Sequence, residues 1–165
     1  MEKTGILTYH YSNNYGGVLQ SYALYAYLRS RRIDAQIINY VPSSYRADSL
    51  VHNIFSSTGL TKNPRNIEIE DFSPRNFAVR VNAKRKYNKK ITGEFDSFRN
   101  SYLGLSNQVN ENDVHTILHD YRTIIVGSDQ IWGPVERNRS IYFLGFDEFK
   151  GNKVSYAADS TIAEV

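Results

Sequence analysis

The sequence predicts an α/β fold in which a Rossmann-like parallel sheet is flanked by helices. The first 40 residues have the pattern of a strand, a glycine-bearing loop, a helix and a second strand, and such a unit implies a right-handed crossover between parallel strands. Short apolar runs near residues 125 and 155 predict two further strands, the first of them buried. A chain of 165 residues, 41% of them hydrophobic, is long enough to form one core.

The N-terminal unit begins with a buried strand over residues 6–8, which a polar loop follows. Residues 18–31 predict a helix that is apolar on nearly all sides, and residues 35–40 predict a second strand that stops before Pro42. A helix of this kind is covered on more than one side. We therefore expect part of it to lie at an interface between domains.

The second half of the chain predicts two helices and two strands. Aromatic residues recur at helical spacing over residues 94–103, and residues 112–119 have one apolar face behind Asn112 as a plausible N-cap. The strands are residues 123–126 and 153–158. We therefore interpret residues 1–165 as a single Rossmann-like domain.

Residues 43–92 are the least patterned segment, and we interpret them as a basic insertion with irregular connections and one or two helices. Seven lysines and arginines between Arg75 and Lys90 have no acidic residue among them, although the net charge of the chain is only +3. This run is either a nucleic-acid or anionic-lipid patch, or a solvated helix or disordered insertion. We favour the second interpretation and expect no nucleic-acid partner.

Cysteine usage and hydropathy indicate the compartment. The chain has no cysteine, which excludes disulfides, a thiolate nucleophile and zinc bound through sulfur. Its longest apolar stretch, residues 22–28, is far shorter than the roughly 20 residues of a membrane span, and the N-terminus lacks the apolar region of a signal peptide. We expect a cytoplasmic protein without a transmembrane segment.

Polar loops follow three of the predicted strands, at residues 8–20, 127–132 and 158–161. Ligands of parallel sheets bind beyond the carboxyl ends of the strands, so we expect these loops to meet along one rim. Gly16 and Gly17 precede the first helix, whose unpaired N–H groups would favour an anion. The glycine pair is equally typical of a tight strand-to-helix turn.

Several side chains in these loops suit a polar ligand. Asp129 directly follows a buried strand, where a carboxylate can orient a hydroxyl group, act as a base or cap the next helix. Trp132 either packs beneath its loop or covers a sugar, and Gln20 either bonds backbone or reaches the crevice. His115 and His119 have metal-ligand spacing, but no third ligand accompanies them, so we expect no metal.

Four segments together resemble the polysaccharide pyruvyl transferase family. They are Gly-Ile-Leu-Thr-Tyr-His-Tyr-Ser-Asn-Asn-Tyr-Gly-Gly-Val-Leu-Gln-Ser-Tyr-Ala-Leu at 5–24, Ile-Val-Gly-Ser-Asp-Gln-Ile-Trp at 125–132, Tyr-Phe-Leu-Gly-Phe at 142–146 and Val-Ser-Tyr-Ala-Ala at 154–158. The resemblance covers most of the chain, and its segments have the family's order.

The resemblance implies the N-terminal half of an enzyme that transfers a pyruvyl group from phosphoenolpyruvate to a sugar hydroxyl of a cell-surface polysaccharide precursor. It implies a domain like the N-terminal one of a GT-B transferase, a saccharide or lipid-linked sugar acceptor, phosphoenolpyruvate as donor substrate and no cofactor. The family's second domain has no counterpart in the sequence, so we expect that domain, or self-association, to complete the site. The alternatives are a fragment of a GT-B-like sugar-nucleotide glycosyltransferase and a non-catalytic carbohydrate-binding or interaction module.

We expect Asp129 to be catalytic. The expected substrate-binding residues are His10, Tyr11, Asn13, Asn14, Tyr15, Gly16, Gly17, Gln20, Ser128, Gln130 and Trp132.

Overall fold

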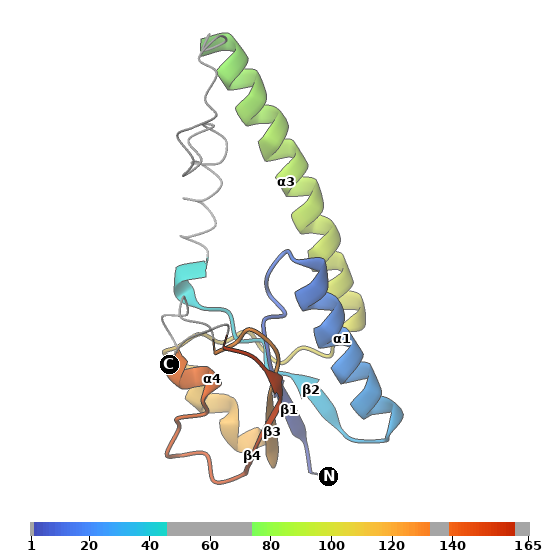
Figure 1. The fold of residues 1–165 in the computed structure, drawn as a ribbon, viewed down its shortest axis with the longest axis vertical. Helices are drawn as coiled ribbons and strands as arrows, with labels where there is room; N and C mark the ends of the chain where they lie inside the picture. The colour runs from blue at the N-terminus through green and yellow to red at the C-terminus, as the bar shows by residue number, and fades with distance from the viewer. Residues whose placement is uncertain (1, 46–73, 133–138, 161–165) are drawn as a thin grey trace. The chain divides into compact units, whose positions relative to one another are not determined.

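The computed structural model describes residues 2–45, 74–132 and 139–160 (Figure 1). The chain divides into two compact units. The first consists of Met1–Pro42 and Asp96–Val165, and the second is Ser43–Phe95. The predicted strands, the loops that follow them and all the expected site residues belong to the first unit.

The first unit is built on a parallel sheet. Four strands of the described residues pair in the order β2-β1-β3-β4, with bounds Ala35–Ile37, Thr4–Leu7, Thr123–Asp129 and Asn152–Ala158. Parallel bridges from Ile37 to Leu105 and from Tyr40 to Val109 add a further extended segment beside β2. The predicted parallel α/β sheet is thus confirmed. The strands overlap the predicted ranges, but β1 lies at Thr4–Leu7 and not at residues 6–8, β2 stops at Ile37 before residue 40, and β3 continues past residue 126 to Asp129.

Alternate residues of the strands enter two separate hydrophobic cores. Ile6 and Ile37 pack with Leu28 of helix α1 (Tyr15–Ser30) on one face. Leu7 and Ile124 pack on the other face with the 3-10 helix η2 (Val114–Asp120) and helix α4 (Arg139–Tyr142). Figure 1 shows α1 and α4 on opposite sides of the sheet. Because both faces are covered near β1, the loop that leaves this strand has a fixed base.

Helix α3 (Pro74–Tyr102) differs from the prediction. The basic run and residues 94–102, expected to be separate, form one continuous helix. No proline follows Pro74 within it, and a helix tolerates a single glycine such as Gly93 at a cost of about 1 kcal/mol. Within the second unit, Lys86, Lys89 and Lys90 are exposed, and Lys90 lies 3.9 Å from Glu94. Residues 46–73 of the predicted insertion lie outside the described residues.

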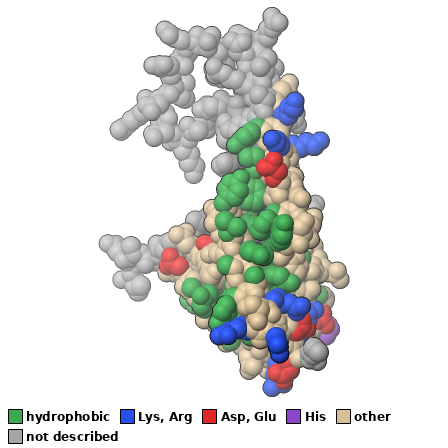
Figure 2. All heavy atoms as spheres, turned by 90° about the vertical axis from the view of Figure 1, so that its right-hand side faces the viewer, with side chains coloured by type: hydrophobic (Ala, Val, Ile, Leu, Met, Phe, Trp, Pro, Cys, Tyr) green, Lys and Arg blue, Asp and Glu red, His purple; other side chains and the backbone are tan. Residues whose placement is uncertain are grey.

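Helix α1 carries apolar side chains on its outer side, as its sequence suggested. Leu19, Tyr22 and Tyr27 are exposed. Tyr22 also packs edge-on against Phe98 and Tyr102 of α3, with ring centroids 5.8 and 6.2 Å apart. Figure 2 shows hydrophobic side chains gathered on the face that α1 occupies. None of the described helices combines the length and apolar character needed to cross a lipid bilayer.

Candidate functional site

The three predicted loops meet at the carboxyl edge of the sheet. The Tyr9 hydroxyl donates to the carbonyl oxygen of Ile131 at 3.5 Å, which joins the loop after β1 to the turn after β3. Backbone hydrogen bonds join that turn to the residues after β4, from Trp132 N to Asp159 O at 3.1 Å and from Asp159 N to Asp129 O at 3.0 Å. The common rim expected from the sequence is therefore present.

Gly17 lies where the first two loops approach most closely. It is buried, and a Cβ atom added to it would lie 3.3 Å from the carbonyl oxygen of Tyr9, 3.4 Å from Ser12 Oγ and 3.5 Å from Asp129 Oδ2. A Cβ atom here would make a tight contact with the Tyr9 carbonyl oxygen but only an ordinary one with Asp129 Oδ2, so the Asp129 carboxylate lies beside the first turn of α1. The Asp129 carboxylate therefore faces the N-terminus of α1 at Gly17.

The start of α1 corrects one expectation. The helix begins at Tyr15, not at residue 18, so Gly16 and Gly17 lie in its first turn. Asn14 is the N-cap, and its side-chain oxygen accepts hydrogen bonds from Gly16 N at 2.8 Å and Gly17 N at 3.3 Å. The sequence suggested that these two N–H groups are unpaired donors for an anion. This expectation is wrong, because the Asn14 side chain already accepts hydrogen bonds from both. Tyr15 is exposed beside them.

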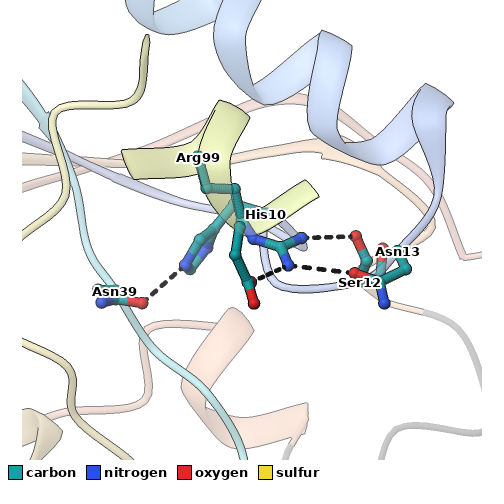
Figure 3. A network of polar contacts seen from close by, with 6 residues as sticks. His10, Ser12, Asn13, Asn39 and Arg99 are labelled. Atoms are coloured by element: carbon teal, nitrogen blue, oxygen red, sulfur yellow. Dashed lines mark hydrogen bonds and ion pairs between the residues drawn. The ribbon is translucent and has the colours of Figure 1, made fainter. Parts of the chain in front are cut away.

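His10 is buried at the base of the same loop, with 1% of its surface exposed. Its Nδ1 lies 3.2 Å from the carbonyl oxygen of Thr8, and its Nε2 lies 3.0 Å from Asn39 Oδ1 (Figure 3). Burial, with a smaller contribution from the positive charge of Arg99, lowers the pKa of His10 below its ordinary 6.5. The imidazole is therefore neutral near pH 7 and is held within the protein, below the surface of the rim.

Arg99 is a residue of this region that the sequence analysis did not select. It comes from the C-terminal part of α3 and is buried, with 8% of its surface exposed. Its guanidinium donates to Ser12 O at 3.2 Å, to Asn13 Oδ1 at 3.1 Å and to Asp96 Oδ1 at 2.6 Å (Figure 3). A signal existed in the sequence, because Arg99 lies four residues after Phe95 on the aromatic face of its helix. A charged side chain on such a face requires buried partners.

The last residues of β3 and β4, which lead into the turn after β3, have an unusual backbone. Gly127, Ser128 and Ala157 all have positive φ, of 131°, 47° and 47°. Gly127 pairs with Tyr156 and Asp129 pairs with Ala158, so the two strands turn together at Ser128 and Ala157. The left-handed region is unfavourable for residues with a side chain, and strain of this kind concentrates at functional sites.

Asp129, the last residue of β3, is half-buried. Its Oδ1 accepts a hydrogen bond from the backbone N–H of Gln130 at 2.8 Å, while Oδ2 faces Gly17. Residues 130–132 form a bend and a turn. Asp129 therefore caps no helix within residues 130–132, and residues 133–138 lie outside the described residues. The Gln130 side chain is exposed beside Asp129.

Gln20 and Ser128 connect the rim to a groove. The Ser128 hydroxyl donates to Gln20 Oε1 at 3.4 Å, so Gln20 does reach the crevice. Both residues line a largely apolar groove of about 500 Å³, together with Leu24, Tyr27 and Tyr156. Gln20 Nε2 is buried and has no hydrogen-bond partner among the described residues. The rim thus continues into a groove between α1 and the β3–β4 pair.

The aromatic candidates have different surroundings. Trp132 is half-buried, stacks on Phe143 with centroids 5.3 Å apart and donates from Nε1 to Tyr142 O at 3.1 Å. It therefore packs beneath its turn, as one of the two interpretations held. Tyr11 is half-buried and packs edge-on against Tyr9 at 5.9 Å. The described residues contain no group of three or more potential metal-ligating side chains.

One comparison with known proteins finds a family. The family model for polysaccharide pyruvyl transferase matches residues 14–158. The chain belongs to this family. The match runs from the N-cap of α1 to the last residue of β4, and so includes the turn after β3. No curated protein and no solved structure matches the chain, so the expected likeness to a GT-B domain stays a prediction.

Proposed function

We propose that the rim binds the acceptor sugar of a pyruvyltransferase reaction, in which phosphoenolpyruvate supplies the pyruvyl group. The observation that carries the proposal is the meeting of three polar loops in a chain of this family. Membership of the family implies a transferase, and the loops supply the hydrogen-bonding groups that a polyhydroxylated ligand requires. The acceptor is a saccharide or a lipid-linked sugar of a cell-surface polysaccharide precursor.

Asp129 is the group best placed to act on a sugar hydroxyl. Ketal formation joins two sugar oxygens to C2 of the enolpyruvyl group, adds a proton to C3 and releases phosphate. Each sugar hydroxyl must lose its proton, which a positioned carboxylate can accept. The Gln130 N–H fixes one Asp129 oxygen and leaves Oδ2 directed toward the first turn of α1. Asn13, Gln20 and Ser128 lie near enough to the same rim to orient the sugar.

The donor side requires positive charge, and the three rim loops contain no lysine or arginine of their own. Asn14 occupies the Gly16 and Gly17 N–H groups, and Asp129 adds a negative charge nearby. We therefore propose that phosphoenolpyruvate is held mainly by a second Rossmann-like domain, which faces this rim in a GT-B-like arrangement. The rim holds the acceptor, and the cleft between the two domains brings the substrates together.

A phosphate-release assay tests this division. The chain is incubated with phosphoenolpyruvate and with methyl glucoside or methyl galactoside, alone and after co-expression with the second domain of a family member. We expect phosphate release only from the combined sample and saccharide binding by the chain alone. Sugar binding without release from either sample would favour a carbohydrate-binding module, and turnover of a nucleotide sugar would favour a glycosyltransferase.

Replacing Asp129 with asparagine tests the proposed base. Asp129→Asn keeps the acceptor for the Gln130 N–H but removes the basic oxygen, so turnover should fall by about 10²- to 10⁴-fold while saccharide binding changes little. The assay is the rate of phosphate release in the combined sample. Asp147→Asn is the control, because it makes the same chemical change at an exposed carboxylate outside the three rim loops. Unchanged turnover in Asp129→Asn would show that Asp129 is not the base.

A further inference from the structure

Arg99 differs from Arg29, Arg31, Arg32 and Arg122, which are exposed, because it is buried and bonds a loop of the candidate site. Its side chain is 9% exposed, whereas its partner Asp96 is 55% exposed. Two further acceptors, Ser12 O and Asn13 Oδ1, belong to consecutive residues of the loop after β1. One planar guanidinium therefore joins the C-terminal part of α3 to the loop that precedes α1 (Figure 3).

The energetics make this connection specific. A buried guanidinium has lost its hydration, so its N–H groups must find acceptors within the protein. Hydrogen bonds to a charged group are stronger than neutral ones, and the fork of an arginine fixes the direction of two acceptors at once. A lysine at this position would keep the charge but would not hold both acceptors in the same geometry. The conformation of residues 12–13 therefore depends on the shape of the side chain, in addition to its charge.

The loop transmits this constraint to the rim. Asn14, the N-cap of α1, directly follows Asn13. Three residues later, Gly17 lies against Tyr9 O, Ser12 Oγ and Asp129 Oδ2. A displacement of residues 12–13 would therefore change the spacing between the start of α1 and the Asp129 carboxylate. Arg99 bonds Asn13, one of the residues proposed to orient the sugar, and acts on the start of α1 through this loop.

We propose that Arg99 is a positioning residue: its guanidinium fixes the loop at residues 12–13 and thereby holds the acceptor-binding rim in its binding conformation. The part of this inference that concerns sugar binding rests on the proposed function. The part that concerns the order of the loop does not, because it follows from the contacts of Arg99 alone.

The test compares two arginine–aspartate pairs in the same chain. Arg99→Gln and Arg99→Lys remove or reshape the buried fork. Arg29→Gln is the matched control, since Arg29 lies 3.0 Å from Asp34 in an exposed pair whose side chains are 50% and 42% exposed. Amide hydrogen exchange is measured residue by residue, and methyl glucoside and methyl galactoside are the binding probes. Asn13→Ala, alone and combined with Arg99→Gln, measures the coupling between the two side chains.

We expect Arg99→Gln to accelerate exchange at residues 12–17 about tenfold or more relative to the amides of β1 and β3, and to weaken sugar binding by a similar factor. Arg99→Lys should recover part of both effects, Arg29→Gln should change neither, and Asn13→Ala should add little in the Arg99→Gln background. An increase in exchange that is uniform over the sheet would overturn the proposal and show that Arg99 only stabilises the core. Unchanged exchange at the loop would overturn it as well.

The two readouts separate this proposal from the proposed function. If the unmodified chain binds neither saccharide, the proposed function fails, while the exchange data still decide whether Arg99 orders the loop. If the loop loosens in Arg99→Gln but a saccharide binds as tightly as before, the proposed function stands and the positioning role is overturned.

Discussion

The loop after β1 and the turn after β3 lie side by side on one rim but are fixed by different means. Side chains hold the β1 loop: Arg99 of α3 donates hydrogen bonds to residues 12 and 13, and Asn14 caps α1. Backbone conformation holds the β3 turn, in which Gly127 and Ser128 have positive φ. The difference shows that one side of the rim depends on hydrogen-bond partners that come from distant segments, whereas the other depends on which residues tolerate the left-handed region.

The largest effect is expected from Gly127→Ala, which tests whether backbone conformation fixes the β3 turn. Gly127 has a φ of 131°, and a Cβ atom would overlap the carbonyl oxygen of Tyr156 on the paired strand. Backbone strain and the forced separation of β3 and β4 should together lower the free energy of unfolding by about 3 kcal/mol or more. Urea denaturation followed by circular dichroism measures this loss.

Gly93→Ala is the control for the glycine substitution itself. Gly93 lies in α3, and a Cβ atom there would meet nothing within 4 Å, so alanine should leave stability unchanged or raise it slightly. A similar stability of Gly127→Ala and the unmodified chain would mean that the β3 turn does not depend on its glycine. It would contradict the claim that the two loops are fixed by different means.

The pH dependence of stability tests whether the buried His10 side chain helps to fix the β1 loop. Its pKa is lowered in the folded protein, chiefly by burial, so the unfolded chain binds a proton more readily below about pH 6.5. Stability should therefore be fully present above pH 6.5 and should fall as the pH decreases toward the folded pKa. For a single proton, the slope is at most about 1.4 kcal/mol per pH unit.

Urea denaturation between pH 7.5 and pH 5.5 measures this slope in three proteins. His10→Gln should flatten the slope relative to the unmodified chain, because glutamine does not titrate. His115→Gln should not, since His115 is exposed on η2. A slope that is the same with and without His10 would show that the buried imidazole does not link the β1 loop to pH.

The sequence was sufficient for the sheet because each strand contains a short apolar run next to polar residues. Burial differs between the strands, since β1 is buried throughout whereas β4 is exposed along most of its length. The failures of the sequence prediction concern groups whose partners are distant in the chain. The start of α1 was placed at residue 18 because glycines resemble a loop, whereas the Asn14 cap and the nearby Asp129 let Gly16 and Gly17 enter the helix. Two acceptors of Arg99, Ser12 O and Asn13 Oδ1, lie more than 80 residues away, at distances along the chain over which local patterns carry no information.

The helix expected over residues 112–119 shows a second kind of failure. The segment forms the 3-10 helix η2, and the expected cap Asn112 makes no cap, because the N-cap position is Asp113, whose Oδ1 accepts from Asn110 N. An apolar face at Val114 and Leu118 suits either helix type over so short a length. Local competition between turn residues, which spacing does not reveal, decided this geometry.

The smallest effect is expected from Asn14→Ala, which separates the cap from the Arg99 contacts within the β1 loop. Losing the acceptor for Gly16 N and Gly17 N should cost about 1 kcal/mol in urea denaturation, whereas Asn14→Ser should keep most of the stability because serine is also a strong N-cap. If Arg99 holds residues 12–13 independently, exchange there should remain slow in Asn14→Ala while the first turn of α1 frays. Fast exchange at residues 12–13 in this variant would instead mean that the cap and the guanidinium act as one unit, and that the β1 loop is fixed only when both are present.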